Sequence, residues 1–166
     1  EEAAKQLFKN FYAYTISQLR ELLTNYGEID VLWFDGLGPW PGINQKIGDT
    51  KVLQTYAWIR SLQPGIVIND RWGWDKSIGD MSTPEMRVPE EKNDGWWESC
   101  NSIKGHWGYS PGRNMWSIDK FCDTYNEIRE KGGNFLANIG PAPDGTMPPE
   151  FYELCRKLKE TPCDDQ

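Results

Sequence analysis

The 166-residue sequence is poor in the residues that build metal centres and catalytic triads. It has one histidine, His106, and four cysteines that form no CxxC pair. Structural zinc sites draw on several such ligands at short spacings, so the sequence does not predict one. No serine or cysteine can be assigned to His106 as a triad partner. We interpret His106 as a core or surface residue, with a place in a functional site as the alternative.

Basic runs and long apolar runs are also missing. The net charge is −7 and the isoelectric point about 4.8, which disfavours binding to nucleic acid and to anionic membranes. No apolar stretch approaches the roughly 20 residues of a membrane-spanning helix. We therefore expect neither nucleic acid nor a membrane as partner. The opening EEAAKQLFKN is polar and helical in character rather than typical of a signal peptide, and the compartment stays open.

The four cysteines, Cys100, Cys122, Cys155 and Cys163, are too few for a disulfide scaffold in a chain of this length. We expect buried thiols, and a single disulfide bridge is the alternative if the protein is secreted. Aromatic residues, in contrast, are abundant, with nine Trp, seven Tyr and six Phe. Such side chains mainly build cores, but their flat rings also suit stacking on the C–H faces of sugars.

Helical and strand-like segments alternate along the chain. Expected helices cover residues 3–26, 49–62 and 148–160, and a further one is marked by Ile118, Phe121, Tyr125 and Ile128. Expected strands cover residues 29–34, 65–69, 96–103 and 134–140, with a doubtful short one near 79–83. This order predicts an α/β fold with about four to five parallel strands in a single domain over residues 1–166. A closed eight-stranded β/α barrel usually needs about 250 residues, so the chain is too short to form one.

Polar residues gather where the apolar strands end. The run from Ile29 to Phe34 has the bias of a strand buried on both faces, and Asp35 follows it directly. Functional groups of β/α folds collect at the carboxyl ends of strands, so Asp35 is a candidate catalytic residue. A helix N-cap or a loop carboxylate is the structural alternative. Arg71 follows the next strand and either binds a sugar hydroxyl, holds a carboxylate or forms a plain ion pair.

Glu85 is a second candidate carboxylate, between Pro84 and Met86 in a loop. Two carboxylates in one set of loops allow the chemistry of glycosidases, in which one attacks the sugar and the other handles the proton. A surface role is the alternative for Glu85, and spacing alone does not separate it from Glu90 and Glu91 of the same loop.

Five segments occur in the order seen in a known family: YGEIDVLWFDG, GIVINDRWG, TPEMRVP, WESCNSI…HWGY and KGGNFLANIGPAPDGTMP. Over essentially its whole length the chain resembles the α-L-fucosidases of glycoside hydrolase family 29. The resemblance implies a (β/α)8-like barrel and retaining exo-hydrolysis of terminal α-L-fucose from fucosylated glycans, with no metal or other cofactor. It implies Asp35 as nucleophile, Glu85 as acid/base, and Arg71 and Trp33 as fucose-binding residues.

The resemblance is to the C-terminal half of the family's catalytic barrel. We therefore expect a partial (β/α)8-like barrel whose activity requires either a complementary N-terminal half or self-association. The alternative function is an inactive or carbohydrate-binding half-barrel remnant, which would keep the Trp33 and Arg71 contacts without turnover.

Overall fold

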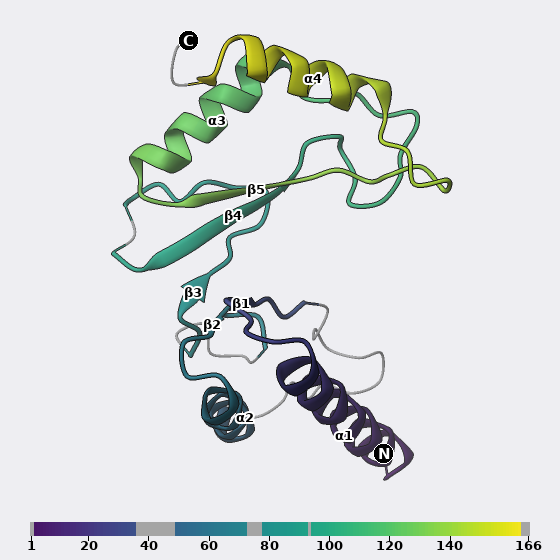
Figure 1. The fold of residues 1–166 in the computed structure, drawn as a ribbon, viewed down its shortest axis with the longest axis vertical. Coiled ribbons are helices and arrows are strands. Elements are labelled where there is room, and N and C mark those ends of the chain that lie inside the picture. The colour runs from purple at the N-terminus through teal and green to yellow at the C-terminus, as the bar shows by residue number, and fades with distance from the viewer. Residues whose placement is uncertain (1, 36–48, 73–77, 93, 164–166) are drawn as a thin grey trace. The chain divides into compact units, whose positions relative to one another are not determined.

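The structure is a computed structural model that describes residues 2–35, 49–72, 78–92 and 94–163 (Figure 1). The chain forms two compact units, Glu1–Ser82 and Thr83–Gln166, and each is described by itself. The elements follow in the order α1 (Glu2–Asn25), β1 (Val31–Leu32), α2 (Asp49–Leu62), β2 (Val67–Ile68), β3 (Met81–Ser82), β4 (Trp96–Ser102), α3 (Ile118–Glu130), β5 (Asn134–Asn138) and α4 (Pro149–Glu160). None of the helices within these ranges is long and apolar enough to cross a membrane.

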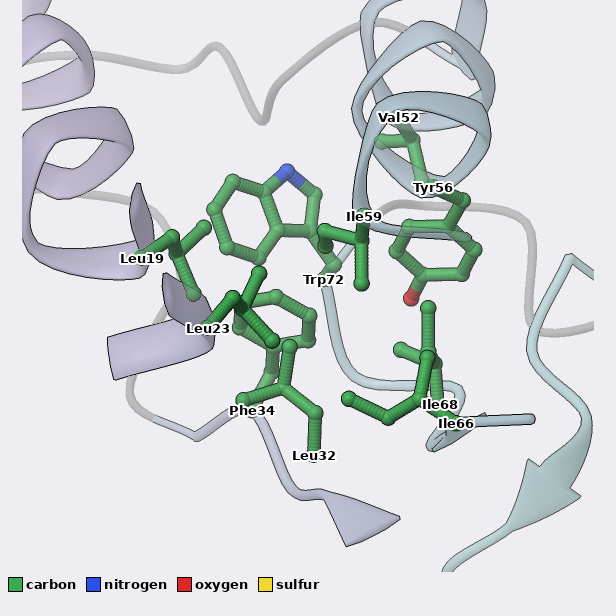
Figure 2. Packing of buried hydrophobic residues seen from close by; sticks show 10 residues of the cluster. All are labelled: Leu19, Leu23, Leu32, Phe34, Val52, Tyr56, Ile59, Ile66, Ile68 and Trp72. Atoms are coloured by element: carbon green, nitrogen blue, oxygen red, sulfur yellow. The ribbon is translucent and has the colours of Figure 1, made fainter. Parts of the chain in front are cut away.

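The first unit packs α1 and α2 around a short parallel strand pair. β1 and β2 run parallel, with Val31 opposite Val67 and Leu32 opposite Ile68. Figure 2 shows the buried side chains that both helices and the strand segments contribute. The cluster consists of Leu19, Leu23, Leu32, Phe34, Val52, Tyr56, Ile59, Ile66, Ile68 and Trp72. The core therefore lies directly behind the strand segment that leads to Asp35.

A glutamine holds together the amino-terminal end of β1 and the two helix ends near it. Gly27 ends the turn after α1 with a φ of +89°, a conformation that glycine adopts at little cost. The Gln63 carboxamide donates to the carbonyls of Leu23 and Gly27, both at 2.9 Å. Its oxygen accepts from the Ile29 amide at 2.7 Å. One side chain thus satisfies backbone groups at the end of α1 and at the entry to the strand.

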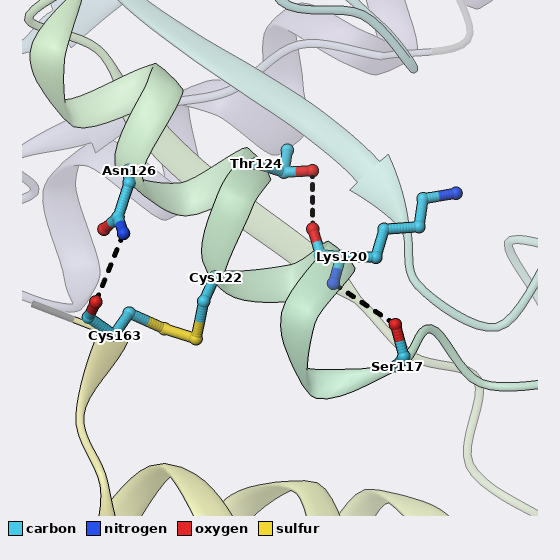
Figure 3. The surroundings of a disulfide bond; sticks show 6 residues. All are labelled: Ser117, Lys120, Cys122, Thr124, Asn126 and Cys163. Atoms are coloured by element: carbon cyan, nitrogen blue, oxygen red, sulfur yellow. Dashed lines mark hydrogen bonds between the residues drawn. A yellow bond between two sulfur atoms is a disulfide. The ribbon is translucent and has the colours of Figure 1, made fainter. Parts of the chain in front are cut away.

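The second unit is built on the parallel pair β4 and β5, in a register from Glu98 opposite Asn134 to Ser102 opposite Asn138. The helices α3 and α4 belong to the same unit (Figure 1). A disulfide between Cys122 of α3 and Cys163, just after α4, joins Cα atoms 5.0 Å apart (Figure 3). The parallel pairing in both units agrees with the parallel strands expected from the sequence.

Two expectations about burial are wrong. Cys122 and Cys163 are bridged and Cys155 is an exposed thiol, so only Cys100 is the buried thiol expected of all four. Local spacing could not show that the segment after α4 returns to α3. The two-residue β1 is also not buried on both faces, because Val31 is 48% exposed while Leu32 is buried. No described side chain covers the outer face of Val31 enough to bury it.

Candidate active site

Asn69 organises the point where β1 and β2 end. The backbone ladder between them closes with the Asn69 amide, which donates to the Leu32 carbonyl at 3.3 Å. Beyond that bond the Asn69 side chain takes over: its oxygen accepts from the Phe34 amide at 2.8 Å, and its nitrogen donates to the Phe34 carbonyl at 2.9 Å. Asn69 is completely buried. The backbone immediately before Asp35 is therefore held in place.

Three of the residues predicted from the sequence meet at this strand end. The Arg71 Nη1 atom lies 3.2 Å from Asp35 Oδ1, and the Arg71 guanidinium carbon lies 4.5 Å from the centre of the Trp33 ring. The Asp35 side chain is 68% exposed and that of Arg71 only 14%. An ion pair this open to water contributes at most about 1 kcal/mol to stability. The contact therefore matters mainly for the orientation of a carboxylate that remains accessible to a ligand.

Aromatic residues support this arrangement from within the core. The Trp72 ring meets the Phe34 ring edge-on, with centroids 3.9 Å apart. The Tyr56 hydroxyl donates to the Asn69 carbonyl at 2.8 Å. Burial, together with the carboxylates of Asp70 and Asp80, raises the pKa of Tyr56 above its ordinary value of 10, so this hydroxyl stays a donor at neutral pH.

The segment that carries Arg71 is fixed by a glycine–aspartate pair that we did not single out from the sequence. A Cβ atom on Gly79 would lie 2.6 Å from the Asp70 amide nitrogen, so only glycine allows this approach. The Asp80 carboxylate accepts from the Ile68 amide at 2.9 Å and from Arg60 Nη2 at 2.6 Å. Glycine and aspartate are both common in ordinary turns, so the sequence showed no sign of these contacts. They became visible only in the three-dimensional structure.

Glu85 lies in the second unit, on the loop that precedes β4. The chain on either side of it is held by Cys100, whose amide donates to the Pro84 carbonyl at 3.1 Å and whose carbonyl accepts from the Met86 amide at 2.9 Å. The Glu85 side chain is exposed. Met86 has a φ of 54°, in the left-handed region that a non-glycine residue seldom occupies. Backbone strain of this kind clusters at functional sites. The sequence did not indicate the strained conformation, because methionine is not a residue typical of it.

The other carboxylates of this region differ in their surroundings. Glu90 and Glu91 are exposed, like Glu85. Glu98 is buried, and its Oε2 atom accepts from the Asn134 side chain at 2.5 Å. Asn134 is the first residue of β5, so this pair sits at the opposite end of the strands from Ser102 and Asn138. Glu98 therefore serves the packing of β4 on β5.

The single histidine lies on the surface of the second unit. His106 is exposed, and its Nδ1 atom accepts from the Gly108 amide at 3.2 Å. The neighbouring Trp107 carbonyl accepts from the Asn138 side chain at 2.9 Å, which fixes this loop to the carboxyl end of β5. Within residues 2–35, 49–72, 78–92 and 94–163, no three His, Cys, Asp or Glu side chains are grouped so that they could hold a metal ion.

The structure thus brings Asp35, Arg71 and Trp33 together in the first unit and places Glu85 in the second. In such an arrangement the charged groups can hydrogen-bond the hydroxyls of a sugar, and the indole ring can stack on its C–H face. The carboxylate can attack an electrophilic carbon.

Comparison with known proteins gives one consistent result. The family model described as alpha-L-fucosidase matches residues 1–160. Tissue alpha-L-fucosidase of Mus musculus is 32% identical over 151 residues, which cover 85% of this chain and 32% of the mouse protein. The chain therefore spans about a third of the length of the curated relatives it matches.

Solved structures agree with this similarity. Alpha-L-fucosidase isoenzyme 1 from Paenibacillus thiaminolyticus is 30% identical with a TM-score of 0.77, over 92% of this chain and 39% of that one. A GH29 alpha-L-fucosidase from Bacteroides thetaiotaomicron, trapped as a covalent intermediate with 2-fluoro-fucosyl fluoride, is 26% identical with a TM-score of 0.79. The match covers 96% of this chain and 41% of the Bacteroides chain.

Proposed function

Because the chain belongs to the alpha-L-fucosidase family, we propose that it carries the nucleophile of a retaining glycoside hydrolase that releases terminal α-L-fucose. The observation that carries this proposal is the Asp35 carboxylate, exposed at the end of β1 and 3.2 Å from the Arg71 guanidinium. The covalent intermediate trapped in the Bacteroides relative supports a mechanism that passes through a covalent intermediate, as retaining glycosidases use.

In the proposed first step, an Asp35 oxygen attacks the anomeric carbon of the fucoside. The bond to the leaving oxygen breaks, and that oxygen takes a proton from the Glu85 carboxyl group, which leaves a fucosyl ester on Asp35. In the second step, the Glu85 carboxylate takes a proton from water, and the water oxygen attacks the same carbon. The ester bond breaks, fucose leaves with retained configuration, and Asp35 is regenerated. No metal or other cofactor takes part.

Arg71 and Trp33 are the proposed fucose-binding residues. The guanidinium of Arg71 can donate to sugar hydroxyls while it holds the Asp35 carboxylate, because it carries several donors in a planar fork. Trp33 offers an indole surface at the same strand end. A fucosylated glycan is thus the proposed partner.

We further propose that both units belong to a single domain, a partial (β/α)8-like barrel that is completed by an N-terminal half or by a second copy of the chain. The TM-scores of 0.77 and 0.79 over about two-fifths of the solved fucosidase chains support a shared partial architecture. Parallel pairing of β1 with β2 and of β4 with β5 is consistent with it. The alternative function is an inactive or carbohydrate-binding remnant.

Hydrolysis of an aryl α-L-fucoside tests the function. The chain is assayed alone and together with the amino-terminal segment of the Paenibacillus relative, and fucose binding is measured on the same samples by calorimetry. We expect nitrophenol release from the complemented protein and its loss in Asp35→Ala. Fucose binding without release would favour the binding remnant. A folded complex that neither binds nor hydrolyses would contradict both functions.

A further inference from the structure

We infer that Asn69 is a positioning residue, which sets the place of the nucleophile Asp35 relative to Arg71. The inference rests on the proposed function, because it assigns Asn69 a part in that reaction. Asn69 touches neither of the two reacting carboxylates in any contact described above. Its effect is exerted through the backbone of Phe34 and through the chain that leads to Arg71.

The first reason is where the strand pairing stops. Paired strands diverge once their backbone hydrogen bonds end, and the last one here joins the Asn69 amide to the Leu32 carbonyl. The Asn69 carboxamide then bonds both polar groups of the Phe34 backbone, at 2.8 and 2.9 Å. Only a carboxamide offers one acceptor and one donor side by side for this purpose. It extends the ordered pairing to the residue directly before Asp35.

The second reason is that Asn69 cannot itself move easily. It is completely buried, and its carbonyl accepts from the Tyr56 hydroxyl of α2 at 2.8 Å. On another side, the Cβ position of Gly79 would lie 2.7 Å from the Asn69 carbonyl carbon, so that turn packs tightly against it. Buried and anchored side chains of this kind give a site the rigidity that catalysis needs.

The third reason is that the chain after Asn69 leads to the partner of the nucleophile. Arg71, two residues on, lies 3.2 Å from Asp35 and 4.5 Å from the Trp33 ring centre. The side chain of Asn69 therefore orders the segment that carries Asp35, and its backbone begins the segment that carries Arg71. Displacing a reacting group by about 1 Å can cost about 100-fold in rate. Loss of the hydrogen bonds between Asn69 and Phe34 should therefore lower the rate at which Asp35 attacks the sugar.

The chain contains a matched control in Gln63. Its carboxamide also bonds backbone groups near β1, namely those of Leu23, Gly27 and Ile29, but at the amino-terminal end of the strand. Gln63→Leu removes at least as many side-chain hydrogen bonds as Asn69→Leu within the same unit. The backbone groups that Gln63 bonds lie before β1, at the opposite end of the strand from Asp35. A purely structural role for Asn69 predicts equal effects of the two variants.

The experiment measures labelling by 2-fluoro-fucosyl fluoride in the complemented protein. The probe loses fluoride as an Asp35 oxygen bonds to its anomeric carbon, and the adduct is followed by intact mass. Rates are compared at matched folded fraction. We expect Asn69→Leu to slow labelling about 100-fold and Gln63→Leu to change it less than about threefold. Hydrogen exchange of the Phe34 amide should accelerate in Asn69→Leu and stay unchanged in Gln63→Leu.

Each other outcome has a definite meaning. Wild-type labelling with no slowing in Asn69→Leu, or equal slowing in Gln63→Leu, overturns the role of Asn69 and leaves the proposed function standing. No labelling of the wild type overturns the proposed function and any catalytic role of Asn69 with it. If Asn69→Leu does not fold, Tyr56→Phe removes only the bond to the Asn69 carbonyl and should slow labelling several-fold. An unchanged rate in that variant also overturns the inference.

Discussion

At the scale of single residues, Asp35 and Glu85 have different surroundings, and the proposed reaction gives them different tasks. Asp35 is held through Phe34 and pairs with Arg71, while Glu85 is exposed on a loop beside the strained Met86. A nucleophile has to be fixed, because its attack depends on distance and angle. A proton donor and acceptor has to reach two different oxygens in turn, so a position on a loop suits it.

The two residues should therefore respond differently to azide. With a nitrophenyl fucoside in the complemented protein, Asp35→Ala should lose nearly all turnover, about 10³-fold or more, because no other group forms the ester. Glu85→Ala should still form the ester, since nitrophenolate leaves with little protonation, but should break it down slowly. Added azide needs no general base, so it should rescue Glu85→Ala and yield fucosyl azide of retained configuration. Product analysis by NMR distinguishes the configurations.

The control for this prediction is the neighbouring carboxylates. Glu90→Ala and Glu91→Ala should keep wild-type turnover, and any product that azide forms in Asp35→Ala should be inverted. Azide rescue of a variant at Glu90, Glu91 or Glu98 in place of Glu85 would show that the acid/base assignment is wrong while the nucleophile assignment holds.

The sequence was informative about residue types at strand ends and silent about how they are held. Asp35 and Arg71 follow apolar runs, and this pattern marked each of them as a candidate site residue; the structure places their side chains 3.2 Å apart. Asn69 also follows an apolar run, but its hydrogen bonds to the Phe34 backbone depend on where the backbone pairing of β1 with β2 ends, which the sequence does not show. The left-handed backbone of Met86 was equally invisible, because methionine does not favour that conformation.

At the scale of elements, the pairing of α3 with α4 is secured twice. The Cys122–Cys163 disulfide joins them, and the Asn126 side chain donates to the Cys163 carbonyl at 3.2 Å (Figure 3). A third link starts from the buried Lys104, whose Nζ atom lies 3.2 Å from the Glu150 carboxylate of α4 and 2.9 Å from the Arg113 carbonyl. These contacts fix α4 against the rest of the second unit.

Removing the disulfide should destabilise this unit substantially. The bridge spans 41 residues of sequence, and closing a loop of this size restricts the unfolded chain by about 2–4 kcal/mol of free energy. We expect the double variant Cys122→Ser/Cys163→Ser to lower the free energy of unfolding in urea by this amount. Cys155→Ser, at an exposed thiol of α4, is the control and should change it by less than about 0.5 kcal/mol. Equal midpoints for the two variants would contradict this prediction.

The contact of α4 with Lys104 should make stability depend on pH in the acid range. A hydrogen bond from its own backbone amide, and then the Lys104 ammonium, lower the pKa of Glu150 below its ordinary value of 4.5. A lowered pKa means that the stabilising contribution is present above pH 4.5 and is lost as the pH falls through the folded-state pKa. Thermal unfolding followed from pH 6 to pH 3 should therefore show a shallower decline in Glu150→Gln than in the wild type.

Part of that decline should remain in the variant. Hydrogen bonds from Thr146 lower the pKa of Asp144, and those from Arg156 lower the pKa of Glu153, in the same unit. Both carboxylates lose their contribution in the same direction as the pH falls. A decline as steep in Glu150→Gln as in the wild type would show that the Lys104 contact contributes nothing measurable.

The helices and the strands β4 and β5 were predicted closely, whereas β1 and β2 were not. Apolar positions recurring along 3–26 and 49–62 predicted α1 and α2 almost to their observed bounds, because one face of each helix is buried. The apolar runs 29–34 and 65–69, however, contain strands of two residues each. An apolar run shows that side chains are buried, whereas a strand also requires a backbone partner, which only the tertiary structure supplies.

At the scale of the whole molecule, part of the apolar surface has no cover in the described chain. A groove of about 340 Å³ runs along α1 beside β1 and is lined in part by Leu22, Tyr26 and Leu32. Leu22, Tyr26 and Val31 are exposed. The pairing of β1 with β2 leaves the other edge of β1 without a ladder partner among the described residues. Such a surface favours association with another chain.

The chain alone should therefore associate in a concentration-dependent manner in sedimentation experiments. Leu22→Glu and Val31→Lys should weaken this association at least about tenfold, because each places a charge on the uncovered surface. Tyr152→Lys, at an exposed aromatic residue of α4, is the control and should leave it unchanged. A sharp monomer at high concentration with cooperative melting would contradict the expectation of an incomplete barrel.

The disulfide also changes what a single break in the backbone can do. Cys122 and Cys163 close a covalent ring that contains most of α3, all of β5 and all of α4. Proteolytic cleavage of any one peptide bond within that ring opens it and releases no fragment, so a nicked chain still migrates as one species without reductant. Treatment with a thiol then divides it into two pieces, whose masses locate the cut.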